Sequence, residues 1–280
     1  MSPSGNTTIL IDSPHVDSPK DRALISNKIM HNLHLGGEQV GFVSYCADGT
    51  PRLDMMEGEF CGNASRAFLA YLLDKGSPAL KHETDESWTC EFSVSGVNKK
   101  LHETCFKTEK GIDALVELDN DIKYITKKYN DTLLDIIEMK GITHVLIDTD
   151  VLNFDEKNYI EISKQIRTNL NLEDLEAVGT IWYKQAVEEI KIFPIVWVKN
   201  TDSVFYETAC GSGTAAIGIA KTLKDKKGLA ILVRQPSNKQ ILVKTKINNG
   251  KITNISIGGI VDIIAKGELY IDDSIIQKLK

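Results

Sequence analysis

The chain has 280 residues, of which 42% are hydrophobic and 26% charged, and its formal net charge at pH 7 is −6. This composition is typical of a globular protein with one large or two ordinary domains, and the negative charge argues against a surface that binds nucleic acid. No apolar run approaches the ~20 residues of a membrane-spanning helix, and the first residues lack the basic and apolar regions of a signal peptide. We therefore expect a cytoplasmic protein with neither a membrane nor a nucleic acid as partner.

The five cysteines are odd in number, widely spaced and free of any C-x-x-C pattern. This spacing favours neither a disulfide framework nor a zinc site, so we expect no metal. Cys61 and Cys210 each precede a glycine at the start of a helical pattern. Cys46, Cys90 and Cys105 lie in strand-like or loop segments, and we interpret them as structural.

In the first half of the chain, β-branched and apolar residues predict a strand over 7–12, and apolar residues at helical spacing predict a helix over about 21–35. A second strand is expected over 39–45. Helical periodicity resumes after Cys61 and stops at Gly76, because glycine commonly ends a helix. Cys61 is therefore expected at a helix N-terminus.

The middle of the chain alternates strand-like pieces and turns over about 91–124, and the polar segment 127–132 is interpreted as a connector. We place a domain boundary there. This gives an N-terminal domain over 1–130 and a C-terminal domain over 131–280, and a return of the last strand to the N-terminal domain is left open.

The second half repeats the order of the first, with a strand over 143–148, a helix over 159–170 and strands over 180–183 and 190–198. A second glycine-rich segment then opens a second helical pattern at Cys210, and an antiparallel meander is expected after it. The sequence therefore predicts an α+β fold made of two copies of one plan.

The two cysteine–glycine segments point to acid/base chemistry. A helix N-terminus presents unpaired backbone N–H groups and the positive end of the helix dipole, so it attracts an anion. A cysteine placed there can have its pKa lowered from ~8.5 to about 3.5–7.5, which makes its thiolate a usable base. If the two halves face one another, one thiolate can remove the α-proton of an amino acid while the opposite thiol delivers a proton to the other face. Backbone amides would stabilise the enolate, and no cofactor would be required.

Blander interpretations of the two segments stay open. A single cysteine at a helix start is most often only a small buried residue. Two cysteines that meet can also form a reversible disulfide. The alternative from another class is therefore a non-catalytic amino-acid-binding protein or a thiol redox protein.

The segments Glu59-Phe-Cys-Gly-Asn-Ala64 and Ala209-Cys-Gly-Ser-Gly-Thr214 resemble the paired cysteine motifs of the diaminopimelate epimerase superfamily, which includes proline racemase. Within it, the chain is most similar to the histidine racemases of staphylopine-type metallophore biosynthesis. The matching segments run in order along nearly the whole chain: 3–10, 38–42, 56–64, 178–179, 207–215 and 235–236. The resemblance implies two pseudo-symmetric α+β domains, each a sheet wrapped around a central helix, with the substrate between them.

The resemblance also implies residue roles. Cys61 and Cys210 would be the acid/base pair acting on an amino-acid substrate without a cofactor, and a homodimer is left open. The substrate-binding residues it implies are Asn6, Glu38, Gln39, Gly62, Asn63, Glu207, Gly211, Ser212 and Gly213. The alternatives are a turn residue for Asn6, a strand-edge residue for Gln39 and a charge that favours a helix N-terminus for Glu207.

Departures from the diaminopimelate epimerase pattern bear on the substrate. Gly141-Ile-Thr-His144 stands where that enzyme has Gly-Asn-Pro-His, and the segment 204–210 contains no arginine. A second substrate carboxylate would lack its partners at a cost of several kcal/mol, whereas Glu38 and Glu207 suit an ammonium or imidazole group. The sequence therefore favours histidine, with diaminopimelate, proline or another amino acid as alternatives, and His144 is interpreted as a strand residue.

One departure concerns the start of the chain. Relatives carry a further strand ahead of the Ser4-Gly5-Asn6 segment, whereas this sequence starts at Met1. A truncated or misannotated start is therefore one expectation.

Overall fold

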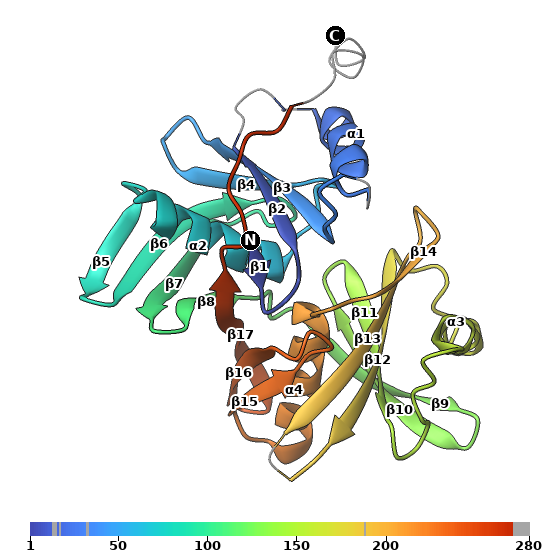
Figure 1. Cartoon of the computed structure of the whole chain (residues 1–280). Helices are drawn as coiled ribbons and strands as arrows, with labels where there is room; N and C mark the ends of the chain where they lie inside the picture. Colours follow the sequence, from blue (N-terminus) through green and yellow to red (C-terminus); the bar gives the residue numbers. More distant parts are fainter. Residues whose placement is uncertain (13–15, 17, 32–33, 188, 271–280) are drawn as a thin grey trace. The chain divides into compact units, whose positions relative to one another are not determined.

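The computed structural model describes residues 1–12, 16, 18–31, 34–187 and 189–270 (Figure 1). The chain divides into two compact units: the first comprises Met1–Val116 and the residues from Ile260 onward, and the second comprises Glu117–Gly259. Both units are mixed α+β and consist mainly of strands. Among the described residues, no helix combines the length and the apolar character that crossing a membrane requires.

The first unit combines two helices with short strands in its described part. Its elements are β1 (Ser2–Pro3), β2 (Thr8–Asp12), α1 (Pro19–Ile29), β3 (Gln39–Tyr45), β4 (Pro51–Met55), α2 (Gly62–Lys75), β5 (Leu80–Thr84), β6 (Ser87–Val94), β7 (Leu101–Thr108) and β8 (Gly111–Glu117). β2 pairs with β3 in parallel, β3 with β4 antiparallel and β4 with β6 in parallel. β5 to β8 pair antiparallel in chain order.

Helix α2 forms the centre of the first unit's core. It contacts β1, β2, β3, β4, β6 and β7, and Figure 1 shows it lying among these strands. Its apolar residues Ala67, Phe68 and Leu72 are fully buried, which matches the helical spacing seen in the sequence. The helix ends at Gly76, whose φ of 65° is left-handed and favours glycine.

The second unit also combines two helices with strands in its described part. They are β9 (Lys123–Tyr129), β10 (Thr132–Met139), β11 (Ile142–Asp148), α3 (Tyr159–Asn169), β12 (Ala177–Gln185), β13 (Ile190–Val198), β14 (Ser203–Tyr206), α4 (Gly211–Asp225), β15 (Leu229–Arg234), β16 (Gln240–Asn248) and β17 (Lys251–Asp262), the last of which continues past Gly259. Neighbouring strands pair antiparallel, except that β11 pairs with β12 and β13 with β15 in parallel.

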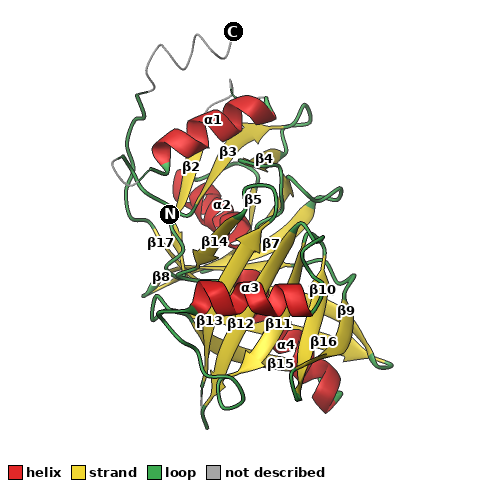
Figure 2. Cartoon of the chain, turned by 90° about the vertical axis from the view of Figure 1, so that its right-hand side faces the viewer, coloured by secondary structure: helices red, strands yellow, loops and turns green. Residues whose placement is uncertain are grey.

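The two helices of the second unit differ in environment. α3 packs its buried Ile166 onto one face of the sheet with Val145 and Ile147 of β11, and Figure 2 shows α3 in front of β11, β12 and β13. α4 contacts β10, β11, β15 and β16. Gly218 allows a close approach there, because a Cβ at this position would lie 2.6 Å from a methyl group of Val243.

The structure differs from the sequence-based expectation near the unit boundary. The segment 127–132 is not a connector, because β9 and β10 form a hairpin that joins Tyr129 to Thr132. The polar character that suggested a connector arises because no side chain of β9 is fully buried: three are exposed and four are partly exposed. The division therefore falls after Val116, ahead of this hairpin, and not at residue 130.

Two other elements also differ. The first helix ends at Ile29, with Met30 as its C-cap, and residues 32–33 of the predicted helix over 21–35 lie outside the described residues. Within the meander expected after Cys210, the sequence predicts separate strands over 252–257, 259–264 and 268–271. The structure instead has one continuous strand, β17, whose end pairs with β1 through Val261 and Asp262, and no strand over the described residues 268–270.

Candidate active site

Cys61 is the N-cap of α2, as the sequence predicts. Its backbone is extended, with φ −131° and ψ 116°, and its Sγ accepts a hydrogen bond from the backbone N–H of Ala64 at 3.4 Å. The hydroxyl of Ser65 donates to the carbonyl oxygen of Cys61 at 2.9 Å. The thiol is half-buried, so one side of the sulfur is held by the helix while access from outside remains.

A chain of hydrogen bonds connects Cys61 to three other candidate residues. The Cys61 thiol donates to Oε1 of Gln39 at 2.9 Å. The Gln39 Nε2 donates to Oδ1 of Asn6 at 2.5 Å, and the Asn6 Nδ2 donates to Oε2 of Glu38 at 2.8 Å. The structure therefore brings Asn6, Glu38, Gln39 and Cys61 together, although Asn6 and Cys61 are far apart in the sequence.

The direction of this chain is set by its charged end. A carboxylate only accepts hydrogen bonds, so Glu38 orients the Asn6 amide and leaves its oxygen to face Gln39. Thr8, which sequence reasoning missed, accepts a second bond from Gln39 Nε2 at 2.8 Å and so reinforces this orientation. The Gln39 carbonyl is consequently fixed as an acceptor for the thiol proton of Cys61.

Cys210 is the N-cap of α4 and repeats the local geometry of Cys61. Its φ is −115° and its ψ 106°, and Sγ accepts from the backbone N–H of Gly213 at 3.3 Å. The hydroxyl of Thr214 donates to the Cys210 carbonyl at 2.7 Å. The Ser212 hydroxyl lies 3.6 Å from Sγ.

The electrostatic environment of Cys210 favours its protonated form. The residue is only 2% exposed, and burial raises its pKa well above the usual value, with the nearby Glu207 carboxylate raising it further. The hydrogen bonds from Ser212 and Gly213 act in the opposite direction, because they stabilise the thiolate. Cys210 is therefore suited to donate a proton.

Gln235 fixes the backbone of this helix start. Its Oε1 accepts from the backbone N–H of Cys210 at 2.9 Å, and its Nε2 donates to the Thr214 hydroxyl at 2.9 Å. Sequence similarity alone marks residue 235, and the buried position of its amide gives the physical reason.

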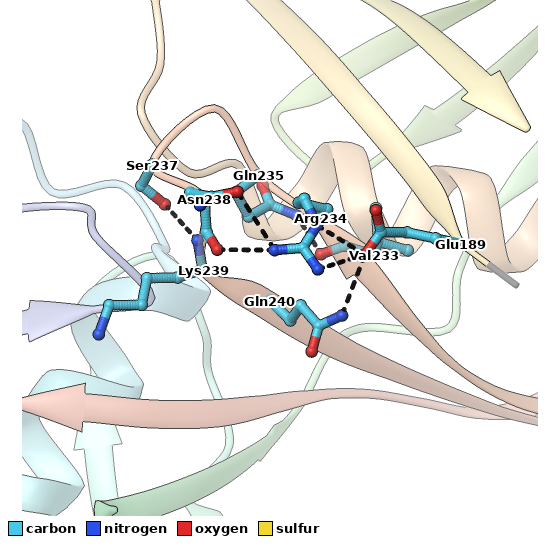
Figure 3. A network of polar contacts seen from close by, with 8 residues as sticks. All are labelled: Glu189, Val233, Arg234, Gln235, Ser237, Asn238, Lys239 and Gln240. Carbon is cyan, nitrogen blue, oxygen red and sulfur yellow. Dashed lines mark hydrogen bonds and ion pairs between the residues drawn. The ribbon is translucent and has the colours of Figure 1, made fainter. Parts of the chain in front are cut away.

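The turn that carries Gln235 is braced by a polar network (Figure 3). Arg234 donates to Glu189 at 2.6 Å and to the carbonyl oxygen of Asn238 at 3.0 Å. Gln240 donates to the same Glu189 oxygen at 3.3 Å. These contacts hold the β15–β16 turn, and with it Gln235, in one position.

The remaining candidate residues lie on the same two helix starts. Gly62 and Asn63 begin α2, and Gly211, Ser212 and Gly213 begin α4. Gly213 has a steric role, because a Cβ would lie 2.9 Å from Cδ1 of Ile181 and 3.0 Å from the Cys210 sulfur. The candidates thus form two sets, one around Cys61 in the first unit and one around Cys210 in the second.

His144 lies on β11, as expected for a strand residue. It is fully buried, and neither ring nitrogen has a hydrogen-bond partner among the described residues. Burial lowers its pKa to about 3, so the imidazole is neutral at physiological pH. The ring packs against Gly179, where a Cβ would lie 2.1 Å from Nδ1.

Cys90 and Cys105 are buried in the core of the first unit, as expected for structural cysteines. Burial raises the pKa of Cys90 to about 11 and that of Cys105 to about 12, so both are unreactive thiols at neutral pH. Within the described ranges, no group of three or more His, Cys, Asp or Glu side chains is arranged to hold a metal ion.

Comparison with known sequences identifies the family that the chain resembles. The family described as "Histidine racemase CntK N-terminal domain" matches residues 1–270. A histidine racemase of Fusobacterium nucleatum is 30% identical over 272 residues, which cover 97% of this chain and 95% of the relative. A histidine racemase of Staphylococcus aureus is 28% identical and covers 97% and 96% of the two chains.

Solved structures show the same fold at low sequence identity. A phenazine biosynthesis protein of the PhzF family from Bacillus anthracis superposes with a TM-score of 0.64 and 13% identity over 93% of this chain and 92% of that one. A probable proline racemase from Agrobacterium radiobacter has a TM-score of 0.64 and 12% identity over 91% and 83% of the two chains.

Proposed function

The chain belongs to the histidine racemase family, a family of isomerases, and we propose that it interconverts L- and D-histidine through Cys61 and Cys210 without a cofactor. The observation that supports this proposal is the matched pair of cysteine N-caps. Each thiol accepts the N–H of the third residue after it, at 3.4 Å in α2 and 3.3 Å in α4. Two such sites in one chain supply the two groups that stereoinversion needs.

In the proposed step, one cysteine is a thiolate and the other a thiol. The thiolate takes the α-proton, and the electron pair of the broken C–H bond moves into the carboxylate, which becomes an enediolate. The opposite thiol then protonates the other face of the carbon and becomes the thiolate. Proton and charge are conserved, and the reverse reaction uses the same groups in exchanged roles. The proposal requires the two cysteines to face opposite sides of one α-carbon.

Backbone amides and side-chain carboxylates would bind different groups of the substrate. The N–H groups at the starts of α2 and α4 suit the substrate carboxylate, whose negative charge grows during proton removal. Glu38 and Glu207 suit the ammonium and imidazole groups of histidine. A second carboxylate, as in diaminopimelate, would meet these acidic side chains and no arginine in the 204–210 segment.

Two finer inferences follow from the resemblance in sequence. We infer that the two units are related copies of one plan, since each has a cysteine at the start of a helix that packs against several strands. We also infer a role in the cytoplasm that supplies D-histidine for a staphylopine-type metallophore. The second inference is tested by comparing the cellular D-histidine content of a deletion strain with that of the wild type during growth.

Deuterium exchange tests the chemistry directly. The purified protein in D₂O is expected to place deuterium at Cα of both histidine enantiomers and to invert them without added cofactor. Cys61→Ser and Cys210→Ser should each lower inversion more than ~1,000-fold, because one face loses its base. Each variant should still exchange the single enantiomer whose α-proton faces the remaining cysteine.

The matched control is Cys46→Ser, which changes another half-buried cysteine of the first unit and should leave inversion unchanged. Binding of histidine without deuterium at Cα would instead identify an amino-acid-binding protein. A circular-dichroism panel with proline and diaminopimelate separates the enzymatic alternatives. Full inversion by the Cys61→Ser, Cys210→Ser double variant would exclude the mechanism.

A further inference from the structure

Arg66 is a fully buried cation one turn into α2, directly after the Cys61 segment. Its side chain is 0% exposed and extends toward the helix N-terminus, as helical side chains do. The guanidinium donates to Oδ1 of Asn63 at 3.2 Å, to Oγ of Ser4 at 2.9 Å and to the carbonyl oxygen of Ala114 at 3.3 Å. It therefore joins the N-terminal turn, the first turn of α2 and β8.

The position is expensive for a positive charge. All three hydrogen-bond acceptors are neutral, and burying a cation without a directly paired anion costs several kcal/mol. The charge also lies at the positive end of the helix dipole, which disfavours it further. Burial lowers the pKa of Arg66 to about 10, and interactions with Asp113 and Cys61 partly offset that effect. Apart from Asp113, the anion that this charge can stabilise is the thiolate of Cys61.

The second cysteine helix has no such charge. Counted from the cysteine, Arg66 is the fifth residue, and the fifth residue after Cys210 is Ala215. The neighbouring charge there is the Glu207 carboxylate, which raises the pKa of Cys210. The two helix starts therefore share their backbone geometry and differ in the sign of the charge that interacts electrostatically with the sulfur.

Three carboxyl groups on the elements around α2 contribute to the electrostatic environment of Arg66. Asp113 on β8 interacts with it electrostatically. Glu103 on β7 is 3% exposed and shares the buried face of Leu101 and Cys105. Glu38, before β3, is hydrogen-bonded to Asn6.

We propose that Arg66 is a positioning residue that stabilises the thiolate of Cys61 and orients the Asn63 amide, so that Cys61 is the anionic member and Cys210 the protonated member of the resting pair. This inference rests on the proposed two-cysteine racemisation. Because Arg66 donates to the Asn63 carbonyl, it fixes the orientation of that side-chain amide.

Gln39 and Arg66 act on the Cys61 proton in opposite directions. The Gln39 carbonyl accepts the thiol hydrogen and favours the protonated form. Loss of the proton leaves the Ala64 N–H and the Arg66 charge to stabilise the sulfur anion. In turnover, the Cys61 thiolate takes the α-proton, Cys210 S–H releases one to the opposite face, and the negative charge passes from one sulfur to the other.

The test measures alkylation of each cysteine by iodoacetamide against pH, with the two peptides quantified by mass spectrometry in the full-length protein. Only the thiolate reacts, so the midpoint of each profile gives the pKa of that thiol. Arg66→Met should raise the Cys61 midpoint by about 1–3 pH units and slow its alkylation at pH 7 by about tenfold or more. Arg66→Lys, which keeps the charge, should restore most of the wild-type profile.

Further measurements separate this role from a structural one. Gln39→Leu should shift the Cys61 midpoint in the opposite direction, and the Cys210 midpoint should change in neither variant. An Arg66→Met protein that folds, as judged by circular dichroism, with a wild-type Cys61 midpoint would overturn the proposal. If that variant does not fold, the wild-type midpoints decide: a Cys61 midpoint equal to or above that of Cys210 rejects it. No substrate is used, so failure of the histidine assay and failure of this inference are distinct results.

Discussion

The starts of α2 and α4 have the same backbone geometry in two different side-chain environments. In both, a cysteine N-cap accepts the N–H of the third residue, and a hydroxyl four residues on, from Ser65 or Thr214, bonds to the cysteine carbonyl. The glutamine partners differ: Gln39 contacts the sulfur of Cys61, whereas Gln235 contacts the backbone N–H of Cys210. Helix capping thus places both sulfurs, and the surrounding side chains decide which of them holds the proton.

The two glutamines should contribute very differently to stability. Gln235 is fully buried, and Gln235→Leu leaves the Cys210 N–H without a partner and removes the bond that the Thr214 hydroxyl accepts, so the free energy of unfolding should fall by about 3 kcal/mol. Gln39 is half-buried and water can replace it, so Gln39→Leu should cost about 1 kcal/mol or less. Urea unfolding of both variants measures the difference, and equal losses would contradict this account of Gln235.

Two fully buried basic side chains also contrast: the first unit buries the Arg66 cation and the second the neutral imidazole of His144. The pKa of His144 is about 3 in the folded protein and 6.5 in a model peptide, so the unfolded chain binds the proton more tightly. His144 therefore contributes stability that is present above about pH 6.5 and is lost as the pH falls toward about 3. The loss should approach about 1.4 kcal/mol per pH unit, or ~2 kcal/mol between pH 6.5 and 5.

His144→Gln is the matched variant, since its side chain is uncharged at every pH. Denaturant unfolding at several pH values measures the free energy of unfolding, which should depend more steeply on pH in the wild type than in the variant. Below pH 6 the difference in slope should correspond to close to one proton taken up on unfolding. Parallel curves for the two proteins would show that the imidazole takes up a proton in the folded state.

The third helical positions provide the finest comparison, because α2 has Ala64 where α4 has Gly213. Gly213→Ala introduces a methyl group against Ile181 and the Cys210 sulfur, which should cost about 1.5 kcal/mol of stability and displace the thiol. We therefore expect inversion to fall about tenfold or more. Ala64→Gly removes a methyl and should cost about 1 kcal/mol through helix propensity alone. Thermal unfolding and circular-dichroism assays of both variants check this, and a fully active Gly213→Ala enzyme would argue against a fixed sulfur position.

Local patterns made much of this architecture predictable. The apolar spacing after Cys61 and Cys210 predicts both central helices, and the structure confirms both cysteines as N-caps. Gly76 ends α2 as expected, because glycine adopts a left-handed φ without strain. The end of β9 was missed because the strand contains three lysines and a threonine and no fully buried side chain, so it carries little apolar signal.

The contacts that tune the cysteines were not predictable in the same way. Arg66 bonds to Ser4 and Ala114, and Cys210 bonds to Gln235, so the partners are distant in sequence. An arginine inside an otherwise apolar helix was the one available signal for Arg66. The direction of the Glu38–Asn6–Gln39 chain depends on geometry that no residue pattern contains.

The pairing of β1 with the end of β17 has a consequence for how the protein is made. Ser2 and its strand partner Asp262 are separated by the whole second unit, so Ser2 is synthesised well before its partner. The segment Glu117–Gly259 is complete before then and interrupts the first unit as an insertion does. Folding during translation should therefore finish the inserted segment before β1 pairs with β17, because that pairing must offset the loop-closure entropy of all the residues between the two strands.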